Sequence, residues 1–314
     1  MLEVIYIVRH GYRSNWAVDP QTGTYSSSVR TPTGIPSDPA LASYGVRQSH
    51  QLATHLLSLD PCPDILYSSP YYRCLQTLAP YVDQLAEHKG EQGVRVTIEP
   101  GLGEFYGEAR FEHPSPAGLE ELNKHFSHLH AEVEPTIVPA KNGESITNLH
   151  DRVAYCLDAL ISRADKDPQQ PKAILICTHA AAIIAMGRCL TGRMPGEIGE
   201  EDFRCFTCGV STFQRRSRND ERMESEGSEV REKWSPNQSS KIPDLGWRDG
   251  SGVQGGWQCE KDSDCSFLEN GEERGWNFYM EKQRIERLEA EAAAAAETTQ
   301  SKAEETAAAH SGIV

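Results

Sequence analysis

The sequence lacks any hydrophobic run of about 18 residues or more, and its N-terminus lacks the charged-then-apolar pattern of a signal peptide. These two absences predict a protein that is neither membrane-spanning nor secreted. Basic residues are also scarce, since 31 Lys and Arg stand against 46 Asp and Glu, for a formal net charge of −15. Such a chain does not attract DNA phosphates by its overall field, so we expect contact with nucleic acid only through a partner protein or a small basic patch.

A disulfide framework is not indicated either. The nine cysteines are odd in number and irregularly spaced, which is typical of a reducing compartment. Cys205, Cys208, Cys259 and Cys265 allow a four-thiolate zinc site as an alternative, but five residues separate the second pair instead of two to four. The alternation of residues 203–208 favours a strand whose cysteines pack as small apolar groups, so we predict no metal there.

The texture of the sequence changes near residue 213. Before that point, short apolar runs alternate with stretches of helical period, and we find no internal repeat. Predicted strands cover residues 4–8, 64–68, 94–98 and 173–177, and predicted helices cover residues 43–58, 71–86, 117–130 and 146–163. The first and last strands are apolar at consecutive positions, as in strands covered on both faces. The pattern predicts an α/β domain over residues 1–213, a three-layer αβα sandwich around a mostly parallel sheet.

Three further segments follow this domain. Residues 214–244 are polar and predict a disordered linker, whose basic cluster at 215–218 is either a solvated stretch or a nuclear-import or nucleic-acid patch. Residues 245–280 carry several aromatics among Gly and Asp, which predicts a small β-rich segment. About 35 residues can hardly bury those aromatics alone, so we expect this segment to bind a partner. Residues 281–314 are rich in Ala and Glu and predict a helix with a disordered end.

Two histidines stand at equivalent places in the predicted sheet. His10, in Arg9-His10-Gly11, directly follows the first strand, and His179 follows the strand at 173–177. Because the carboxyl ends of parallel strands open into one crevice, the two imidazoles can meet there. A single histidine is more often a satisfied core or loop residue, but a pair at matching strand ends favours a functional site.

Three arginines gather at the same strand ends. Arg9 and Arg13 flank His10, and Arg73 lies where a strand turns into a helix. Guanidinium groups match phosphate oxygens in bidentate geometry, so this cluster predicts a buried anion pocket. An isolated arginine would instead be expected in a surface salt bridge.

A candidate proton donor lies in the Gly-rich turn after the strand at 94–98. Desolvation in that turn would raise the pKa of Glu104 and make it a usable acid near neutral pH. Glu108 competes for this role, and either carboxylate is a solvated loop residue if the turn is exposed.

These parts together suit phosphoryl transfer through a phosphohistidine, and the set resembles the histidine phosphatase superfamily, which is phosphoglycerate mutase-like. The matching features occur in that family's order over roughly residues 1–213: Arg9-His10-Gly11, Ser69-Pro70 with Arg73, Glu104, Gly143-Glu144-Ser145 with Arg152, and Thr178-His179. The resemblance implies a phosphomonoesterase that needs neither metal nor cofactor. In it, His10 is the nucleophile, Glu104 the proton donor, and Arg9, Arg13, Arg73 and His179 bind phosphate. Bulky Tyr12 and charged Arg13 argue against a sugar-phosphate mutase pocket.

The strings Tyr6–Trp16, Glu104-Phe105-Tyr106 and Thr178–Ala181 more narrowly resemble fungal transcription factor IIIC subunits that carry a histidine phosphatase domain. The segment Gly275–Tyr279 resembles the signature by which such subunits join their larger tau partner. This resemblance implies a nuclear protein of the RNA polymerase III transcription machinery that meets DNA only through its complex. Two alternatives stay open: a catalytically weak assembly subunit, or a free cytoplasmic phosphatase of small phosphoesters. Tyr12, Trp16 and Tyr106 favour bulky esters as substrates.

Overall fold

The computed structural model describes residues 1–90, 94–130, 134–217, 233–236, 241–280 and 283. The chain forms two units, one made of Met1–Met194 with Asp202–Trp276, the other of Pro195–Glu201 with the chain from Asn277 onward. The second unit has few described residues, among which the Asn277 amide donates to the Glu201 carboxylate. The fold and the site described below belong to the first unit.

A six-stranded sheet with the order β5-β4-β6-β1-β7-β8 forms the centre of the first unit. Four neighbouring strands are parallel: β1 (Val4–Arg9), β4 (Ile65–Ser68), β5 (Val96–Ile98) and β6 (Ala173–Thr178). Two more extend the sheet in antiparallel pairing: β7 (Val210–Arg215) and β8 (Trp257–Asp264). Every residue of β6 and the first five of β1 are buried, which explains their unbroken apolar sequence.

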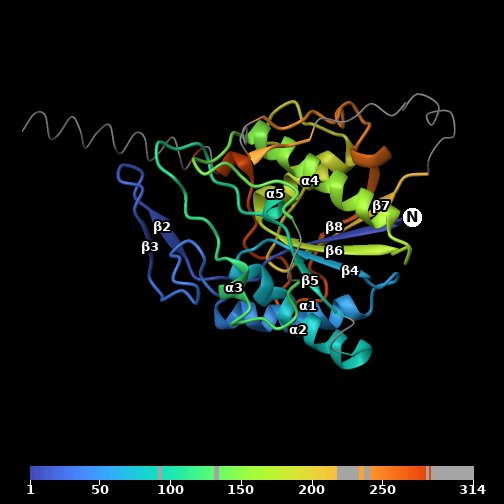
Figure 1. The fold of residues 1–314 in the computed structure, drawn as a ribbon, viewed down its shortest axis with the longest axis horizontal. Helices are drawn as coiled ribbons and strands as arrows, with labels where there is room; N and C mark the ends of the chain where they lie inside the picture. Colours follow the sequence, from blue (N-terminus) through green and yellow to red (C-terminus); the bar gives the residue numbers. More distant parts are fainter. Residues whose placement is uncertain (91–93, 131–133, 218–232, 237–240, 281–282, 284–314) are drawn as a thin grey trace, which may run out of the picture. The chain divides into compact units, whose positions relative to one another are not determined.

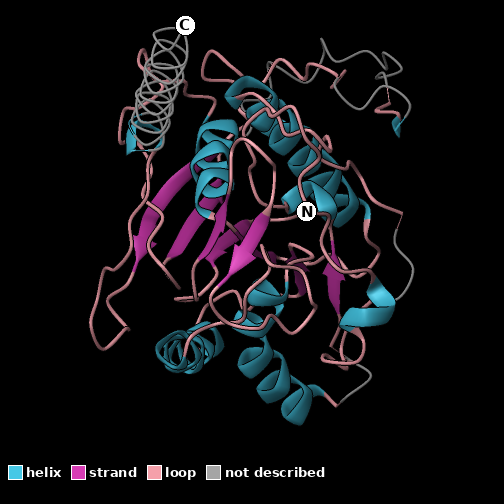
Figure 2. Cartoon of the chain, turned by 90° about the vertical axis from the view of Figure 1, so that its left-hand side faces the viewer, coloured by secondary structure: helices cyan, strands magenta, loops and turns pink. Residues whose placement is uncertain are grey.

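Helices cover both faces of this sheet. On one face lie α1 (Ser43–Leu57) and α2 (Tyr72–Lys89), and on the other α4 (Ile146–Lys166) and α5 (Ala180–Thr191) (Figure 1). Figure 2 shows the strands side by side between the helices. The predicted three-layer αβα architecture with a mostly parallel sheet is confirmed. None of the described helices is long and apolar enough to cross a membrane.

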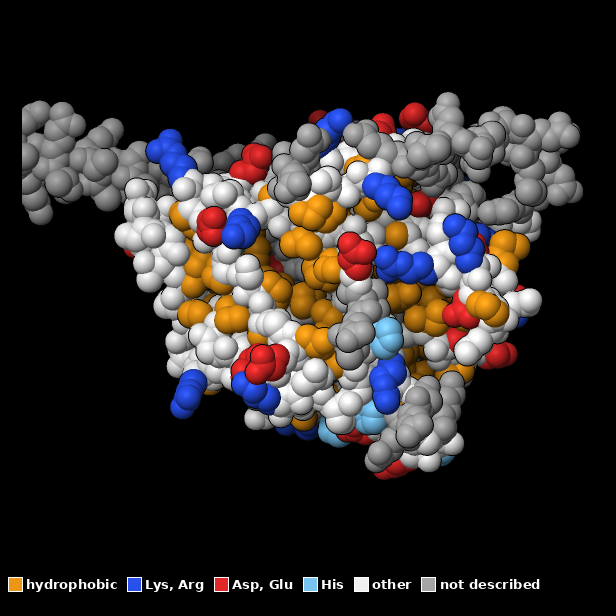
Figure 3. Space-filling model, in the orientation of Figure 1, with side chains coloured by type: hydrophobic (Ala, Val, Ile, Leu, Met, Phe, Trp, Pro, Cys, Tyr) orange, Lys and Arg blue, Asp and Glu red, His pale blue; other side chains and the backbone are white. Residues whose placement is uncertain are grey.

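Short elements lie at the carboxyl edge of the sheet. They are the hairpin of β2 (Trp16–Val18) and β3 (Tyr25–Ser27), the 3-10 helix η2 (Pro100–Leu102) and the short helix α3 (Leu119–Leu122). A further 3-10 helix, η5 (Val253–Gly255), precedes β8. On the face seen in Figure 3, hydrophobic side chains gather between the hairpin and the helical layer of α4 and α5, where part of the connection between α3 and α4 crosses. Val138, in the connection between α3 and α4, is 41% exposed.

Two sequence-based predictions about local structure are wrong. The helix expected over residues 117–130 stops after α3, because His128 and His130 form backbone hydrogen bonds of 2.8 and 2.9 Å with Val96 at the sheet edge. Residues 203–208 form no strand, since the chain turns there and pairs with the sheet only from Val210. In both places a tertiary contact overrides the local pattern.

Much of the C-terminal aromatic segment packs against the rest of its own chain. Trp247 and Trp257 are 1% and 0% exposed, and the Arg215 guanidinium lies 4.6 Å from the ring centre of Trp257. His150 stacks on Trp247 with ring centres 6.3 Å apart, and Trp257 donates from Nε1 to the Val253 carbonyl at 3.2 Å, so the described part of the chain itself buries these two aromatics. Of the expected linker and tail, residues 218–232, 237–240, 281–282 and 284–314 lie outside the described residues.

A buried histidine between α4 and the C-terminal segment makes stability depend on pH. Burial, then the neighbouring Arg188 and Arg248, lower the pKa of His150 to about 4, although a hydrogen bond to the Ile146 carbonyl opposes them. The unfolded chain binds a proton on this histidine below about pH 6.5, whereas the folded chain does not. We therefore expect His150 to remove up to about 3 kcal/mol of unfolding free energy between pH 6.5 and 4.

Urea unfolding at a series of pH values measures this loss. The His150→Gln variant cannot titrate and should show a shallower fall over the same range. Equal slopes for both proteins would contradict the assignment of acid sensitivity to His150.

Candidate active site

The two predicted catalytic histidines lie side by side at the carboxyl edge of the sheet. β1 and β6 are parallel neighbours in the register Arg9↔Thr178, so the residues that follow them emerge together. The ring centres of His10 and His179 are 5.4 Å apart at an interplanar angle of 62°. Their exposed fractions are 3% and 0%. The sheet topology thus builds the imidazole pair that the strand ends predict.

The hydrogen bonding of His10 leaves one ring nitrogen available. Its Nδ1 lies 2.8 Å from the carbonyl oxygen of Gly11, which can only accept, so Nδ1 carries the proton and Nε2 keeps its lone pair. Burial, then the positive charges of Arg73, His179, Arg9 and Arg13, hold the pKa of His10 well below its ordinary value. A neutral imidazole with a free Nε2 can act as a nucleophile at neutral pH.

Arg73 is the charged centre of the site. Its side chain is fully buried in the first turn of α2, where Nη1 donates to Asp38 at 3.3 Å and Nη2 to Glu104 at 3.0 Å. Nη2 also lies 3.3 Å from Nδ1 of His179. Sequence reasoning missed Asp38, because no local spacing relates this loop carboxylate to an arginine in α2.

His179 is held from both sides of its ring. Nε2 lies 2.7 Å from the Ser69 hydroxyl oxygen, and Nδ1 lies 3.3 Å from the Glu104 carboxylate. Burial alone would lower the pKa of His179, but the neighbouring Cys74 and Glu104 outweigh it and raise that pKa. A protonated His179 adds positive charge to the pocket.

The expectation that desolvation raises the pKa of Glu104 is wrong for the free protein. Burial does push the pKa upward, but His179, Arg73 and Arg13 outweigh it and hold the pKa well below the ordinary value. Glu104 is therefore a carboxylate before substrate arrives. Glu108, the competing candidate, is exposed and outside this cluster.

The other two arginines of the site, Arg9 and Arg13, donate to backbone carbonyls. Arg9 directs Nη1 to the carbonyl oxygens of Cys205, at 2.6 Å, and Arg274. Arg13 donates from Nη1 to the Ser14 carbonyl at 2.9 Å. Burial, then Arg73, lowers the pKa of Arg13 to about 10, which leaves it charged at neutral pH.

The charge of the cluster fits an anion better than a cation. Nitrogen and oxygen atoms of His10, Glu104 and His179 lie within 4.8 Å of one another, a spacing that a metal could exploit. A metal ion there would face the Arg73 guanidinium, 3.0 Å from the same carboxylate, and the positive charges of Arg9 and Arg13. The Nε atoms of Arg9 and Arg73 are buried and have no hydrogen-bond partner among the described residues. Buried donors of this kind are rare unless a ligand completes them.

The four cysteines considered for a zinc site have other contacts in the structure. Within the described ranges, Cys205 donates from Sγ to the Trp276 carbonyl at 3.1 Å, and Cys259 to the Lys261 carbonyl at 3.4 Å. Cys208 and Cys265 belong to the hydrophobic core.

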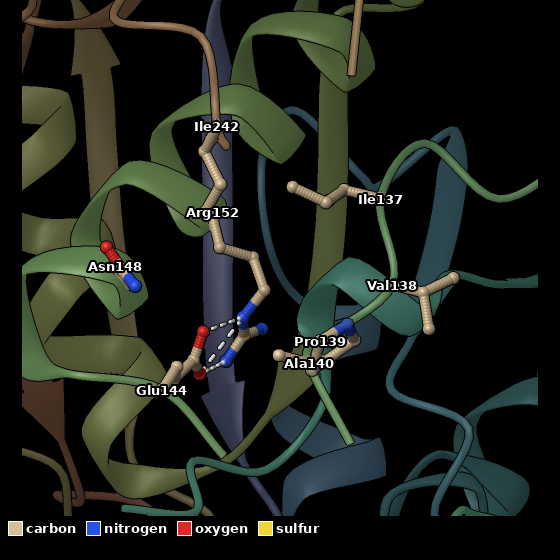
Figure 4. A pocket seen from close by; sticks show the side chains of 8 residues that line it. All are labelled: Ile137, Val138, Pro139, Ala140, Glu144, Asn148, Arg152 and Ile242. Carbon is tan, nitrogen blue, oxygen red and sulfur yellow. Dashed lines mark hydrogen bonds and ion pairs between the residues drawn. The ribbon is translucent and has the colours of Figure 1, made fainter. Parts of the chain in front are cut away.

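A buried ion pair supports the turn that carries Glu104. Arg152, on α4, donates from Nε to both carboxylate oxygens of Glu144 at 2.9 and 3.1 Å, and from Nη1 to the Gly101 carbonyl at 2.7 Å (Figure 4). Gly101 lies in η2, three residues before Glu104, and has no room for a side chain, since a Cβ would meet Ile137 at 2.7 Å. Ile137, Val138 and Ile242 line a small cavity beside this pair, apart from the histidines.

Removal of this ion pair should lower the stability of the fold. We expect Arg152→Met to lower the free energy of unfolding by about 3 kcal/mol, because it leaves the Glu144 carboxylate buried and unpaired. Arg163→Met is the matched control on the same helix. The Arg163 side chain is 43% exposed, and its ion pair with Glu99 is weak, with 4.0 Å between Nη1 and the carboxylate oxygen. Chemical unfolding measures both variants, and equal losses would contradict the supporting role of Arg152.

Aromatic side chains lie next to the catalytic cluster. Tyr71 packs edge-to-face on His179 with ring centres 5.1 Å apart, and its hydroxyl donates to that of Tyr106 at 3.1 Å. Tyr106 stacks on His113 at 4.7 Å and lies 6.1 Å from Trp16 in β2. Two of the three aromatics expected at the mouth, Trp16 and Tyr106, are thus brought together. Tyr12 instead packs against Tyr44 at 5.8 Å.

The comparison with known families agrees with this geometry. The family model described as histidine phosphatase superfamily (branch 1) matches residues 5–224. The chain belongs to the histidine phosphatase superfamily. Its relatives include the transcription factor tau 55 kDa subunit of Saccharomyces cerevisiae, which is 32% identical over 284 residues, or 88% of this chain. The human ubiquitin-associated and SH3 domain-containing protein A is 27% identical over 62% of the chain.

This histidine phosphatase chain spans 59% of the length of the yeast subunit and 32% of the human protein. Among solved structures, the ecdysone phosphate phosphatase of Bombix mori, in complex with tungstate, aligns with a TM-score of 0.52 and 18% identity. That alignment covers 68% of this chain and 89% of the Bombix chain, and it establishes the shared fold.

Proposed function

We propose that the chain is a metal-independent phosphomonoesterase that acts through a phosphohistidine on His10. The observation that carries the proposal is the neutral, buried His10, whose Nε2 has no hydrogen-bond partner among the described residues and lies within a cluster of guanidinium groups. The unpartnered Nε donors of Arg9 and Arg73 are the expected ligands of the phosphoryl oxygens. Membership of the superfamily supports the same chemistry.

The first step forms a bond between His10 Nε2 and phosphorus and breaks the bond from phosphorus to the leaving oxygen. Arg9, Arg13, Arg73 and His179 hold the three equatorial oxygens and stabilise their charge. The leaving oxygen takes a proton from Glu104. In the second step Glu104 removes a proton from water, whose oxygen attacks phosphorus, and inorganic phosphate departs as His10 is restored.

Substrate binding itself prepares Glu104 as an acid. The free protein keeps this group ionised through Arg73 and His179. A bound phosphate dianion occupies those cations and adds negative charge beside the carboxylate, and both effects raise the pKa of Glu104. A substrate that binds as the phosphate monoanion can give its proton to Glu104 and remain bound as the dianion.

The aromatic cluster indicates which esters fit. Trp16, Tyr25 and Tyr106 lie with ring centres 5.4 to 6.2 Å apart, next to the Tyr71 that packs on His179. Aromatic walls of this kind favour a bulky or aryl leaving group over a small sugar phosphate.

We further propose that the protein is a nuclear subunit of a transcription factor IIIC complex. The similarity to the yeast tau 55 kDa subunit supports this role. In this view residues 245–280 join a larger tau subunit, which would supply the contact with DNA. An assembly role without turnover is the second candidate, and the similarity to the yeast subunit supports it, because that similarity covers 88% of the chain whereas the phosphatase family model matches only residues 5–224.

Hydrolysis of p-nitrophenyl phosphate by the full chain, with and without EDTA, tests the enzymatic proposal. We expect turnover that EDTA does not reduce. A folded protein without turnover would leave the pocket as an anion-binding site and favour the assembly role. Turnover that EDTA abolishes would contradict the metal-independent mechanism.

A further inference from the structure

A segment beyond the family match crosses the domain and ends at the catalytic loop. We call residues Cys265–Trp276 the strap; the family model stops at residue 224. The strap follows α1, with Phe267 stacked on His55 at a centroid distance of 4.1 Å and Asn270 bound to the Tyr44 hydroxyl at 3.0 Å. Glu273 accepts a hydrogen bond of 3.4 Å from Gln48, whose side-chain oxygen in turn accepts one of 2.9 Å from the Tyr12 amide.

The strap touches the Arg9-His10-Gly11-Tyr12 loop at Arg274. The guanidinium of Arg274 lies 4.8 Å from the ring centre of Tyr12, and its Nη2 donates to the Tyr12 hydroxyl at 2.7 Å. The carbonyl oxygen of Arg274 accepts from Nη1 of Arg9. One strap residue therefore holds both ends of the four-residue catalytic loop.

The backbone at this point is fixed in a conformation that an arginine rarely adopts. Arg274 has a φ of 56°, in the left-handed region. Hydrogen bonds on both sides hold it there, since the Glu273 carbonyl accepts from the Thr207 amide and the Trp276 carbonyl from Cys205 Sγ, both at 3.1 Å. In this backbone conformation the Arg274 carbonyl accepts the hydrogen bond from Arg9.

We infer that Arg274 is a positioning residue that orients Arg9 toward the phosphoryl group. This inference rests on the proposed function, in which Arg9 binds phosphate. Nη1 of Arg9 has two hydrogens, and the carbonyls of Cys205 and Arg274 accept from it. With one edge of the guanidinium fixed in this way, the unpartnered Nε is left for an oxyanion. The strap thereby makes the C-terminal extension part of the catalytic machinery.

The Arg274 side chain is exposed, so its contribution to stability should be small. Its hydrogen bond to the Tyr12 hydroxyl anchors the strap on the catalytic loop and so keeps the Arg274 carbonyl in reach of Arg9, and loss of this anchor should be visible in catalysis. For Arg274→Ala we expect kcat/KM for p-nitrophenyl phosphate to fall about tenfold, with KM raised and kcat lowered. The dissociation constant for inorganic phosphate should rise by a similar factor. Arg274→Lys keeps a cation over the Tyr12 ring and should recover most of the loss.

Arg47→Ala is the matched control, because Arg47 is an exposed arginine that lies 5.3 Å from the ring centre of Tyr44 but does not touch the catalytic loop. We expect this variant to match the wild type in turnover and phosphate binding. Thermal unfolding of all variants shows whether a loss comes from folding. A double-mutant cycle with Tyr12→Phe should show coupling, since both changes break one contact.

Calorimetric titration with inorganic phosphate separates this inference from the proposed function. If the wild type binds phosphate without hydrolysing esters, the proposed function fails, yet Arg274→Ala must still weaken binding. Unchanged phosphate affinity and unchanged kcat/KM in folded Arg274→Ala would overturn the positioning role. Equal losses in Arg274→Ala and Arg47→Ala would overturn it as well.

Discussion

Replacement of His10 by alanine is expected to lower phosphomonoester turnover by about 10⁴-fold or more, because it removes the nucleophile. The guanidinium cluster stays in place in this variant, so affinity for inorganic phosphate should change little. The result expected is thus a loss of kcat without a comparable loss of binding. Single-turnover hydrolysis of p-nitrophenyl phosphate and phosphate titration measure the two quantities.

His50→Ala is the matched control for this experiment, since His50 is an exposed histidine on α1, away from the catalytic pair. It should retain wild-type turnover. Residual activity of His10→Ala within tenfold of the wild type would show that another group attacks phosphorus.

Glu104→Gln is expected to separate the two steps of the reaction. The amide cannot protonate a leaving oxygen, so hydrolysis of a poor leaving group such as an alkyl phosphate should fall about a thousandfold. p-Nitrophenolate leaves without a proton, so its release should suffer much less. Because water activation also fails, the variant should give a burst of p-nitrophenolate and then stall as phosphoenzyme.

Stopped-flow absorbance measures the burst, and Glu108→Gln, a change at an exposed neighbour in the same loop, is the control. Equal losses for both kinds of ester, without a burst, would contradict the role of Glu104.

A further expectation concerns the pH dependence of the reaction. The pKa of Glu104 should rise when phosphate binds, so a pH profile of kcat should show this acid at higher pH than a profile of kcat/KM.

The parts of the site that follow from single strands could be predicted from the sequence. His10 and His179 stand directly after apolar runs, and any parallel sheet with those strands as neighbours brings them together. The ranges of α1, α2 and α4 were also readable from helical period, because each buries one face.

What escaped the sequence depends on contacts between distant residues. In the sequence, nothing distinguishes Asp38 from other loop carboxylates, whereas in the fold its carboxylate lies 3.3 Å from the Arg73 guanidinium. The pKa of Glu104 follows from the same placement: burial and the surrounding cations act in opposite directions, and only the geometry shows that the cations win. The contact of Arg274 with Arg9 joins residues 265 positions apart, which no local pattern encodes.

The most direct test of the account is to trap the phosphoenzyme during turnover. Wild type and Glu104→Gln would be mixed with p-nitrophenyl phosphate, quenched in alkali within milliseconds, and analysed by mass spectrometry. We predict one phosphoryl group on His10, stable in alkali and lost in acid, with more of it in Glu104→Gln than in the wild type. Turnover with no adduct on His10, or with an acid-stable adduct on another residue, would contradict it.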